Sequence, residues 1–224
     1  MSRILLVRHG QASFGAADYD QLSPTGAEQS RVLGAALAAR DIHPDVLVTG
    51  EMRRHAQTAA GARDGSAWDA DVEVEVDAGW NEFDHLQVLS VHSAPSPAEG
   101  ESETAAFQRW FEEATLRWTS GDHDAEYDES FATFSGRVEA ALARLVRALP
   151  ARGTAVVLTS GGPIAWAAAS LLADDTPSRT DLWLRLNPVS VNTGVSTIVC
   201  GSRGTTLVSF NAHDHLSPDL LTYR

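Results

Sequence analysis

The sequence predicts an α/β protein, because short apolar segments typical of buried strands alternate with segments that have the spacing of amphipathic helices. The clearest strand candidates are Ile4–Val7, Val46–Val48 and Ala155–Leu158. Between the first two, the segment 27–40 places apolar side chains on one helical face. The chain has 224 residues, 43% of them hydrophobic, which is enough for one domain with a sizeable core.

The first predicted strand runs directly into Arg8, His9 and Gly10. Ligands of α/β sheets bind where strands end. A guanidinium suits phosphate oxygens, a neutral imidazole can attack phosphorus, and glycine lets the backbone approach an anion closely. This segment therefore predicts phosphoryl chemistry. Gln11 and Ser13 follow and are expected to make polar contacts with the substrate, with ordinary loop positions as the alternative.

The second strand end also carries arginines. Val46–Val48 leads into a segment that contains Arg53, Arg54, His55 and Thr58. Two strand ends therefore supply side chains that bind phosphate. His55, beside the second arginine, could reach the site and take the place of a missing donor, but on a helix we expect it to face solvent or neighbouring elements.

These motifs resemble the histidine phosphatase superfamily, also called phosphoglycerate mutase-like, over nearly the whole chain. The resemblance implies a three-layer α/β/α sandwich with a mostly parallel central sheet. The matching segments are Arg8-His9-Gly10, Leu22–Gly26 with Gln29, Arg54 with Thr58, Asn81-Glu82-Phe83, Asn192–Val195 and Asn211–Leu216.

The resemblance also implies the roles of the residues that match. His9, neutral and held in one tautomer by a backbone carbonyl, is the nucleophile that becomes phosphohistidine. Arg8 and Arg54 neutralise the phosphoryl oxygens, with Arg53 as the register alternative to Arg54. Since the arginines supply positive charge, we expect neither a metal nor another cofactor.

The general acid implied by the resemblance is Glu82, which follows the predicted strand Val72–Val76. It would protonate the leaving alcohol and then, as a carboxylate, activate water. Asp84 is the alternative if the register shifts by two residues, and a solvated loop carboxylate is the structural alternative for Glu82.

The chain departs from the family pattern at Ser160. The family places a second catalytic histidine after this strand, and here Thr159 is followed by Ser160 and Gly161. A serine can donate a hydrogen bond to the phosphoryl group but brings no positive charge, so we expect catalysis slowed by on the order of a hundredfold. Gly161 precedes a helix that we expect to begin at Pro163, whose N-terminus favours phosphate.

Ser160 has two other interpretations. It could serve as a helix N-cap alone, which is physically sound. A Ser-His-Asp nucleophile requires a glycine two residues earlier, where this chain has Leu158. The sequence therefore favours a phosphate-binding position over a hydrolase nucleophile.

A single domain over 1–224 is expected, with a lid or insertion at about 78–130. Within it, 78–102 contains Ser93–Pro97 and has the composition of a long loop. Helices are predicted at about 103–118 and 131–149. In relatives of this type such an insertion covers the site and governs substrate choice.

The net charge of −13 disfavours nucleic acid and anionic membrane partners. The single cysteine, Cys200, excludes a disulfide framework and suits the cytoplasm. His213 and His215 lack the companions of a metal site, and we expect His215 to hold the tail against the core. The tryptophans suit either internal packing or a homodimer face.

The function predicted from these features is hydrolysis of a small phosphorylated metabolite through phospho-His9, with reduced activity because of Ser160. The alternative is a degenerate relative that binds phosphate-containing ligands without turnover. A phosphoglycerate mutase is less favoured, because a site that lacks one cationic donor is poorly suited to retain phosphate between half-reactions.

Overall fold

The structure is a computed structural model that describes residues 1–13, 20–66, 68, 72–98 and 100–223. It divides into two compact units. The first comprises Met1–Glu82 with Val138–Arg224, and the second comprises Phe83–Arg137. The second unit overlaps the segment predicted as an insertion, whose role as a lid stays a prediction.

The first unit is built on a six-stranded sheet with the order β3-β2-β4-β1-β5-β6. The pairs β1/β4, β4/β2 and β2/β3 are parallel, and β5 is antiparallel to both β1 and β6. The mostly parallel sheet expected from the sequence is therefore confirmed. The strands are β1 (Ser2–Arg8), β2 (Val46–Thr49), β3 (Val74–Val76), β4 (Thr154–Thr159), β5 (Val195–Gly201) and β6 (Gly204–Ala212).

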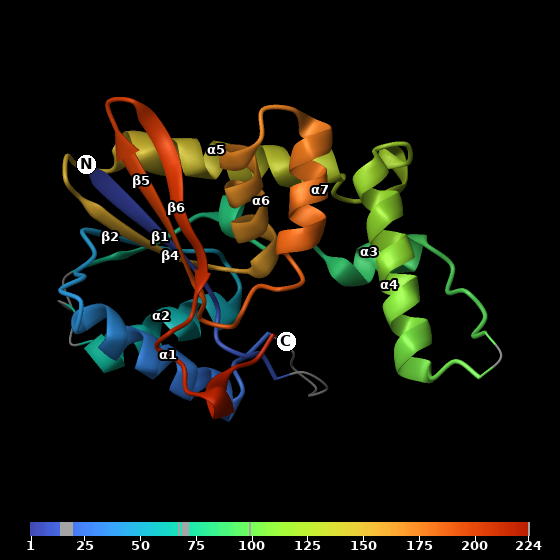
Figure 1. Ribbon diagram of the computed structural model, residues 1–224, viewed down its shortest axis with the longest axis horizontal. Helices are drawn as coiled ribbons and strands as arrows, with labels where there is room; N and C mark the ends of the chain where they lie inside the picture. Colours follow the sequence, from blue (N-terminus) through green and yellow to red (C-terminus); the bar gives the residue numbers. More distant parts are fainter. Residues whose placement is uncertain (14–19, 67, 69–71, 99, 224) are drawn as a thin grey trace. The chain divides into compact units, whose positions relative to one another are not determined.

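Helices cover both faces of this sheet, as the predicted sandwich requires (Figure 1). On one face lie α1 (Pro24–Ala38) and α2 (Arg53–Ser66). On the other lie α6 (Gly161–Leu172), α7 (Thr176–Leu186) and the part of α5 (Phe131–Ala148) that belongs to this unit. Because both faces are covered, the central strands can be apolar on both sides: Ile4–Val7 and Ala155–Leu158 are at most 3% exposed.

The start of α6 differs from the prediction. The helix begins at Gly161, not at Pro163. Ser160 is its N-cap residue by backbone position, but its side chain makes no capping hydrogen bond. The N-cap interpretation of Ser160 therefore does not account for its hydroxyl, which is used elsewhere.

The second unit contains α3 (His85–Val91), α4 (Glu103–Ser120) and the first turns of α5. The helix α3 lies where the sequence predicted a long loop, and it begins because the Asp84 carboxylate accepts hydrogen bonds from the Leu86 and Gln87 amides. An aromatic cluster holds the unit together, with Trp118 stacked on Phe83 at a centroid distance of 4.8 Å.

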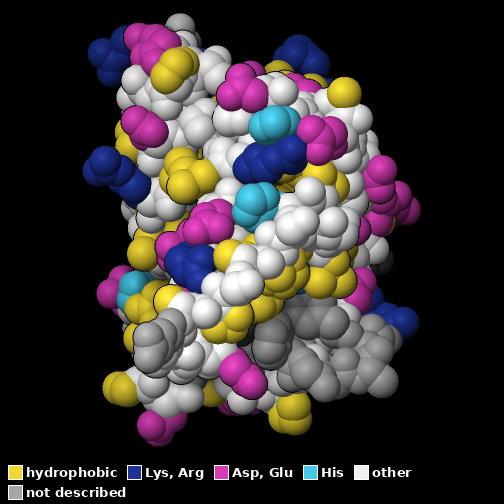
Figure 2. Space-filling model, turned by 90° about the vertical axis from the view of Figure 1, so that its right-hand side faces the viewer, with side chains coloured by type: hydrophobic (Ala, Val, Ile, Leu, Met, Phe, Trp, Pro, Cys, Tyr) yellow, Lys and Arg dark blue, Asp and Glu magenta, His cyan; other side chains and the backbone are white. Residues whose placement is uncertain are grey.

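Charge is distributed over the surface. On the face drawn in Figure 2, acidic side chains are interspersed with arginines, histidines and hydrophobic groups. Within the described part of the chain, no helix has the length and apolar character needed to cross a membrane.

The helices α1 and α2 approach closely because glycines face carbonyl groups at their contact. A Cβ on Gly34 would overlap the carbonyl of Ala62, and a Cβ on Gly65 would overlap the carbonyl of Arg31. These glycines leave no room for a methyl group. The position of α2, and of the side chains at its N-terminus, depends on this contact.

We predict that Gly34→Ala lowers the free energy of unfolding by about 1–3 kcal/mol, because overpacking must separate the two helices. Gly136→Ala is the matched control. Gly136 is also helical, but a Cβ there has open space, so alanine should stabilise the helix by about 0.5–1 kcal/mol. Urea unfolding of both variants measures the difference, and equal effects would contradict the packing argument.

Candidate active site

The parallel pairing of β1 with β4 sets the centre of the site. Arg8 lies opposite Thr159 in the register, and the His9 amide donates to the Thr159 carbonyl at 2.8 Å. The segments that follow β1 and β4 therefore leave the sheet at the same place, with His9 and Ser160 as neighbouring residues. This is the strand-end location that the sequence predicted for phosphoryl chemistry.

His9 is held as a neutral imidazole in one tautomer. Its side chain is buried, and its Nδ1 lies 2.7 Å from the Gly10 carbonyl oxygen. A carbonyl can only accept, so Nδ1 carries the hydrogen and Nε2 carries the lone pair. Burial lowers the pKa of His9 well below its ordinary value, and the charges of Arg54 and Arg8 lower it further.

The backbone around His9 is fixed by three contacts. The Gly10 amide donates to Thr58 Oγ1 at 3.0 Å, and Asn192 Nδ2 donates to the His9 carbonyl at 3.1 Å. A Cβ on Gly10 would overlap the carbonyl of Gly26. Glycine is therefore required here for packing against the start of α1, in addition to any approach to an anion.

The two predicted arginines lie near enough to His9 for their charges to lower its pKa. Arg8 donates to the carbonyls of Ser190 and Tyr223, the latter at 2.8 Å. Arg54, 6% exposed, donates through Nη1 to Asp20 Oδ1 at 2.7 Å and through Nη2 to Ser160 Oγ at 3.5 Å. The register alternative, Arg53, has an exposed position on α2.

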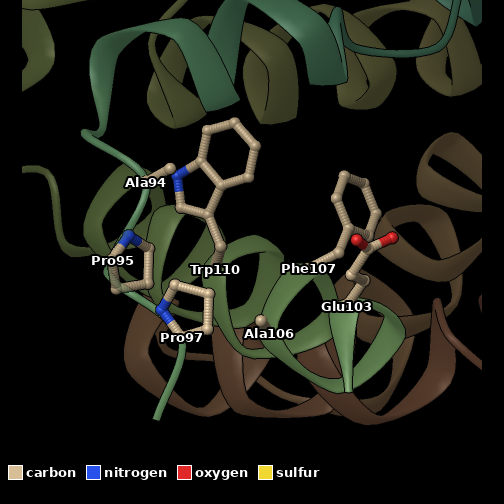
Figure 3. Close-up of a pocket in the computed structure, with 7 residues that line it drawn as sticks. All are labelled: Ala94, Pro95, Pro97, Glu103, Ala106, Phe107 and Trp110. Atoms are coloured by element: carbon tan, nitrogen blue, oxygen red, sulfur yellow. The ribbon is translucent and has the colours of Figure 1, made fainter. Parts of the chain in front are cut away.

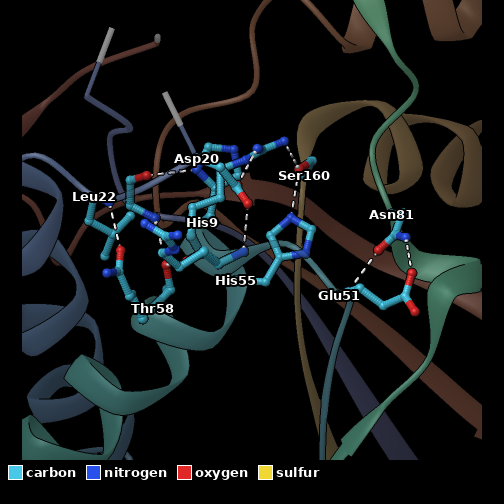
Figure 4. Close-up of polar contacts among 12 residues, drawn as sticks. His9, Asp20, Leu22, Glu51, His55, Thr58, Asn81 and Ser160 are labelled. Atoms are coloured by element: carbon cyan, nitrogen blue, oxygen red, sulfur yellow. Dashed lines mark hydrogen bonds and ion pairs between the residues drawn. The ribbon is translucent and has the colours of Figure 1, made fainter. Parts of the chain in front are cut away.

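Ser160 is fully buried and its hydroxyl contacts His55. The two atoms, Ser160 Oγ and His55 Nε2, are 2.8 Å apart (Figure 4). His55 does not face solvent, and the alternative that it reaches this cluster is the one observed, because α2 turns its side chain inward next to Arg54. Burial lowers the pKa of His55 well below its ordinary value, and the Arg54 charge adds to this effect.

Glu82 lies at the N-terminus of α6, where its Oε2 accepts a hydrogen bond from the Gly162 amide at 3.1 Å. The preceding segment is tied to the sheet, because the Thr159 hydroxyl donates to the Trp80 carbonyl. The Asn81 side chain also bonds the Glu51 amide at 2.7 Å (Figure 4). These contacts bring the Glu82 carboxylate, which follows β3 in the sequence, to the N-terminus of α6, next to Ser160.

The remaining predicted residues lie around this centre. A Cβ on Gly161 would lie 2.9 Å from Asn187 Oδ1, so the glycine leaves room for that side chain, and Arg8 Nε lies nearby. Gln11 accepts from the Ser23 hydroxyl at 2.8 Å, and the Ser13 amide donates to the Gln21 carbonyl at 2.8 Å. The substrate-binding roles expected for Gln11 and Ser13 stay predictions.

Asp20 is a site residue that the sequence analysis missed. Its Oδ1 pairs with Arg54 and its Oδ2 accepts from the Arg53 amide at 2.8 Å. It therefore orients the arginine and also caps the N-terminus of α2. No local pattern identifies such a contact, because the acid and the helix are more than thirty residues apart.

An apolar groove in the second unit lacks comparable chemistry. Its walls include Pro95, Phe107 and Trp110, and Glu103 is the titratable side chain on its lining (Figure 3). Across the described residues, no group of three or more His, Cys, Asp or Glu side chains is placed to hold a metal ion.

His215 was expected to hold the tail of the chain against the core through a hydrogen bond. In the structure His215 Nε2 lies 3.2 Å from Thr193 Oγ1, which confirms this contact.

Comparison with protein families gives a match over nearly the whole chain. A family model described as the histidine phosphatase superfamily (branch 1) matches residues 4–213. No curated protein matches the chain significantly in sequence.

Solved structures of phosphatases share the fold at low sequence identity. A phosphoserine phosphatase from Entamoeba histolytica is 20% identical, with a TM-score of 0.67 over 97% of this chain and 100% of that one. A putative alpha-ribazole-5'-P phosphatase from Escherichia coli is 21% identical, with a TM-score of 0.65 over 94% and 96%. A mycobacterial glucosyl-3-phosphoglycerate phosphatase is 21% identical, with a TM-score of 0.66 over 95% and 99%.

We predict that Thr58→Val destabilises the fold by about 1–3 kcal/mol, because the Gly10 amide loses its buried acceptor. Thr58→Ser is the matched control, since it keeps the hydroxyl that also donates to the Arg54 carbonyl at 2.7 Å. Thermal unfolding compares the two variants. If valine proves as stable as serine, the hydroxyl does not hold the backbone beside His9.

Proposed function

The chain belongs to the histidine phosphatase superfamily, and from that premise we propose that it hydrolyses a small phosphomonoester through a phosphohistidine formed on His9. The observation that carries the proposal is the state of His9. A neutral imidazole whose Nδ1 hydrogen is fixed on a carbonyl presents the Nε2 lone pair as a nucleophile. The charges of Arg8 and Arg54 both act on that nucleophile and suit a phosphoryl group.

In the first step His9 Nε2 attacks phosphorus in line with the leaving alcohol. The N–P bond forms as the P–O bond to the alcohol breaks, and Glu82 protonates the departing oxygen. Arg8 and Arg54 stabilise the charge on the equatorial oxygens, with the Ser160 hydroxyl and the Gly161 amide at the start of α6 as neutral donors.

In the second step water attacks the phosphohistidine. Glu82, now a carboxylate, takes a proton from the water as the new P–O bond forms. The N–P bond breaks, its electron pair returns to Nε2, and inorganic phosphate leaves. His9 regains its neutral state, in which Nδ1 still donates to the Gly10 carbonyl.

The substrate class that we propose is a phosphomonoester of a small alcohol in the cytoplasm. The net charge of −13 opposes substrates with several phosphates, while buried arginines bind one phosphoryl group locally. The similar structures are phosphatases for phosphoserine and glucosyl-3-phosphoglycerate by their descriptions, which agrees with this class.

A second candidate is phosphate binding without turnover. Arg54 is already engaged by the Asp20 carboxylate, and Ser160 supplies a neutral donor to the phosphoryl group. Both features lower the electrostatic stabilisation available to the transition state more than they lower ground-state binding. Activity measurements separate the two candidates directly.

We predict that the chain hydrolyses an aryl phosphate and that His9→Ala removes the activity. Because the pKa of His9 is lowered, the nucleophile stays neutral below pH 6.5. Protonation of His9 should therefore produce no fall in kcat/KM, which reports the free enzyme, between pH 8 and 6.5. Intact mass spectrometry after quenching in base detects phosphohistidine in the native chain and not in His9→Ala. A native chain that binds phosphate but neither turns over nor becomes phosphorylated would support the second candidate.

The role of Glu82 is tested by the leaving group. Glu82→Gln should lower kcat for an alkyl phosphate by about 10²–10⁴-fold, because an alkoxide needs a proton to depart. The decrease in the rate of the phosphorylation step should be much smaller for a nitrophenyl phosphate, whose leaving group is stable as an anion. Pre-steady-state bursts resolve that step, and Asp84→Asn serves as the control for the register alternative. Equal losses on both substrates would show that Glu82 is not the acid.

A further inference from the structure

His55 is a buried titratable side chain beside the proposed site, and the steps above give it no role. It follows Arg54 on α2 and is 0% exposed. Its ring centroid is 5.7 Å from that of His9, and its Nε2 is 2.8 Å from Ser160 Oγ. Two histidines therefore flank the point where a phosphoryl group would bind, one from β1 and the other from α2.

The hydrogen bonds at Ser160 Oγ determine what this contact does. Arg54 Nη2 lies 3.5 Å from the same oxygen, and a guanidinium can only donate. At His55, Nδ1 is buried and has no hydrogen-bond partner among the described residues. A hydrogen on Nδ1 would leave a buried N–H without an acceptor even when substrate is bound, whereas a hydrogen on Nε2 leaves only the Ser160 O–H, which a bound phosphoryl oxygen can accept. The hydrogen of the neutral ring is therefore placed on Nε2. His55 Nε2 then donates to Ser160 Oγ.

With this tautomer Ser160 Oγ accepts two hydrogen bonds, one from Arg54 and one from His55. Its own hydrogen is then directed away from both donors, and no acceptor for it lies among the described residues. An oxygen that accepts two bonds, one of them from a cation, becomes a stronger donor through its remaining O–H. The hydroxyl is thus polarised, and its hydrogen is left for a further acceptor.

We infer that His55 is a positioning residue that acts through Ser160: it orients and polarises the Ser160 hydroxyl as a donor to the phosphoryl group that His9 attacks. This inference rests on the proposed phosphatase function. His55 does not touch substrate. Together with Arg54 it makes a neutral serine a stronger and better aimed donor at this position.

Gly50 leaves room for the His55 ring in the space that the ring occupies. It follows β2, and a Cβ there would lie 2.6 Å from His55 Nδ1 and 2.8 Å from Asn81 Oδ1. Glycine therefore leaves room for the imidazole at the end of β2. The ring is enclosed between α2, this strand end and Ser160, so its orientation is set by packing as well as by the hydrogen bond.

Kinetics of matched variants test the inference. His55→Leu should lower kcat on the order of tenfold to a hundredfold, with KM changed much less, because a transition-state donor is weakened. His55→Gln should retain most of the activity, since its amide nitrogen can replace Nε2 as the donor. His43→Leu removes an exposed histidine and is the control, with no effect expected.

The decisive comparison is the double variant His55→Leu/Ser160→Ala. If His55 acts through Ser160, the double variant is no slower than Ser160→Ala alone. Two results would show that His55 only packs. In the first, the rate losses of the two single variants multiply in the double variant, and in the second, His55→Gln is as slow as His55→Leu. A native chain without activity would refute the proposed function instead, and the next measurement does not depend on turnover.

The tautomer of His55 is measured by ¹⁵N NMR on the native chain near pH 7, with His55→Gln used to assign the signals. The expected spectrum shows a neutral ring with its hydrogen on Nε2. A hydrogen on Nδ1 would mean that Ser160 donates to His55 and has no hydrogen left for a phosphoryl oxygen. That result would overturn the inference whatever the enzyme's activity.

Discussion

The parallel pairing of β1 with β4, buried on both faces, is the constraint on which the rest of the site depends. Its register places Arg8 opposite Thr159, so the segments that carry His9 and Ser160 leave the sheet at the same edge. Buried strands of this kind resist slippage, because a shift of one residue would exchange the side chains on the two faces. His9 and Ser160, about 150 residues apart in sequence, are thereby held together.

Burial then sets the electrostatics of the site. His9 lies beside Arg54 in a nearly closed environment, and both desolvation and positive charge favour the neutral imidazole that a nucleophile requires. The same environment makes an isolated buried guanidinium costly, and the Asp20 carboxylate offsets that cost at Arg54. Charge is therefore balanced locally, within a chain whose overall charge is strongly negative.

The helices contribute through close approach. Gly34 allows α2 to pack tightly on α1, and that packing fixes the N-terminal turn of α2 from which Arg54 and His55 reach Ser160. Glu82 arrives from a different segment and meets the start of α6 through the Gly162 amide. The precision of the site thus comes from secondary-structure contacts around it as much as from the functional side chains themselves.

The sequence by itself determined the α/β class, the central strands and the segments that carry His9 and Arg54, because apolar runs and strand-end motifs are local patterns. It did not determine the roles of Asp20 and His55. Asp20 reaches α2 across more than thirty residues. The inward direction of His55 depends on how α2 packs against α1 and β4. Such contacts have no local signature, since they are selected by tertiary packing, and only the folded chain joins His55 to Ser160.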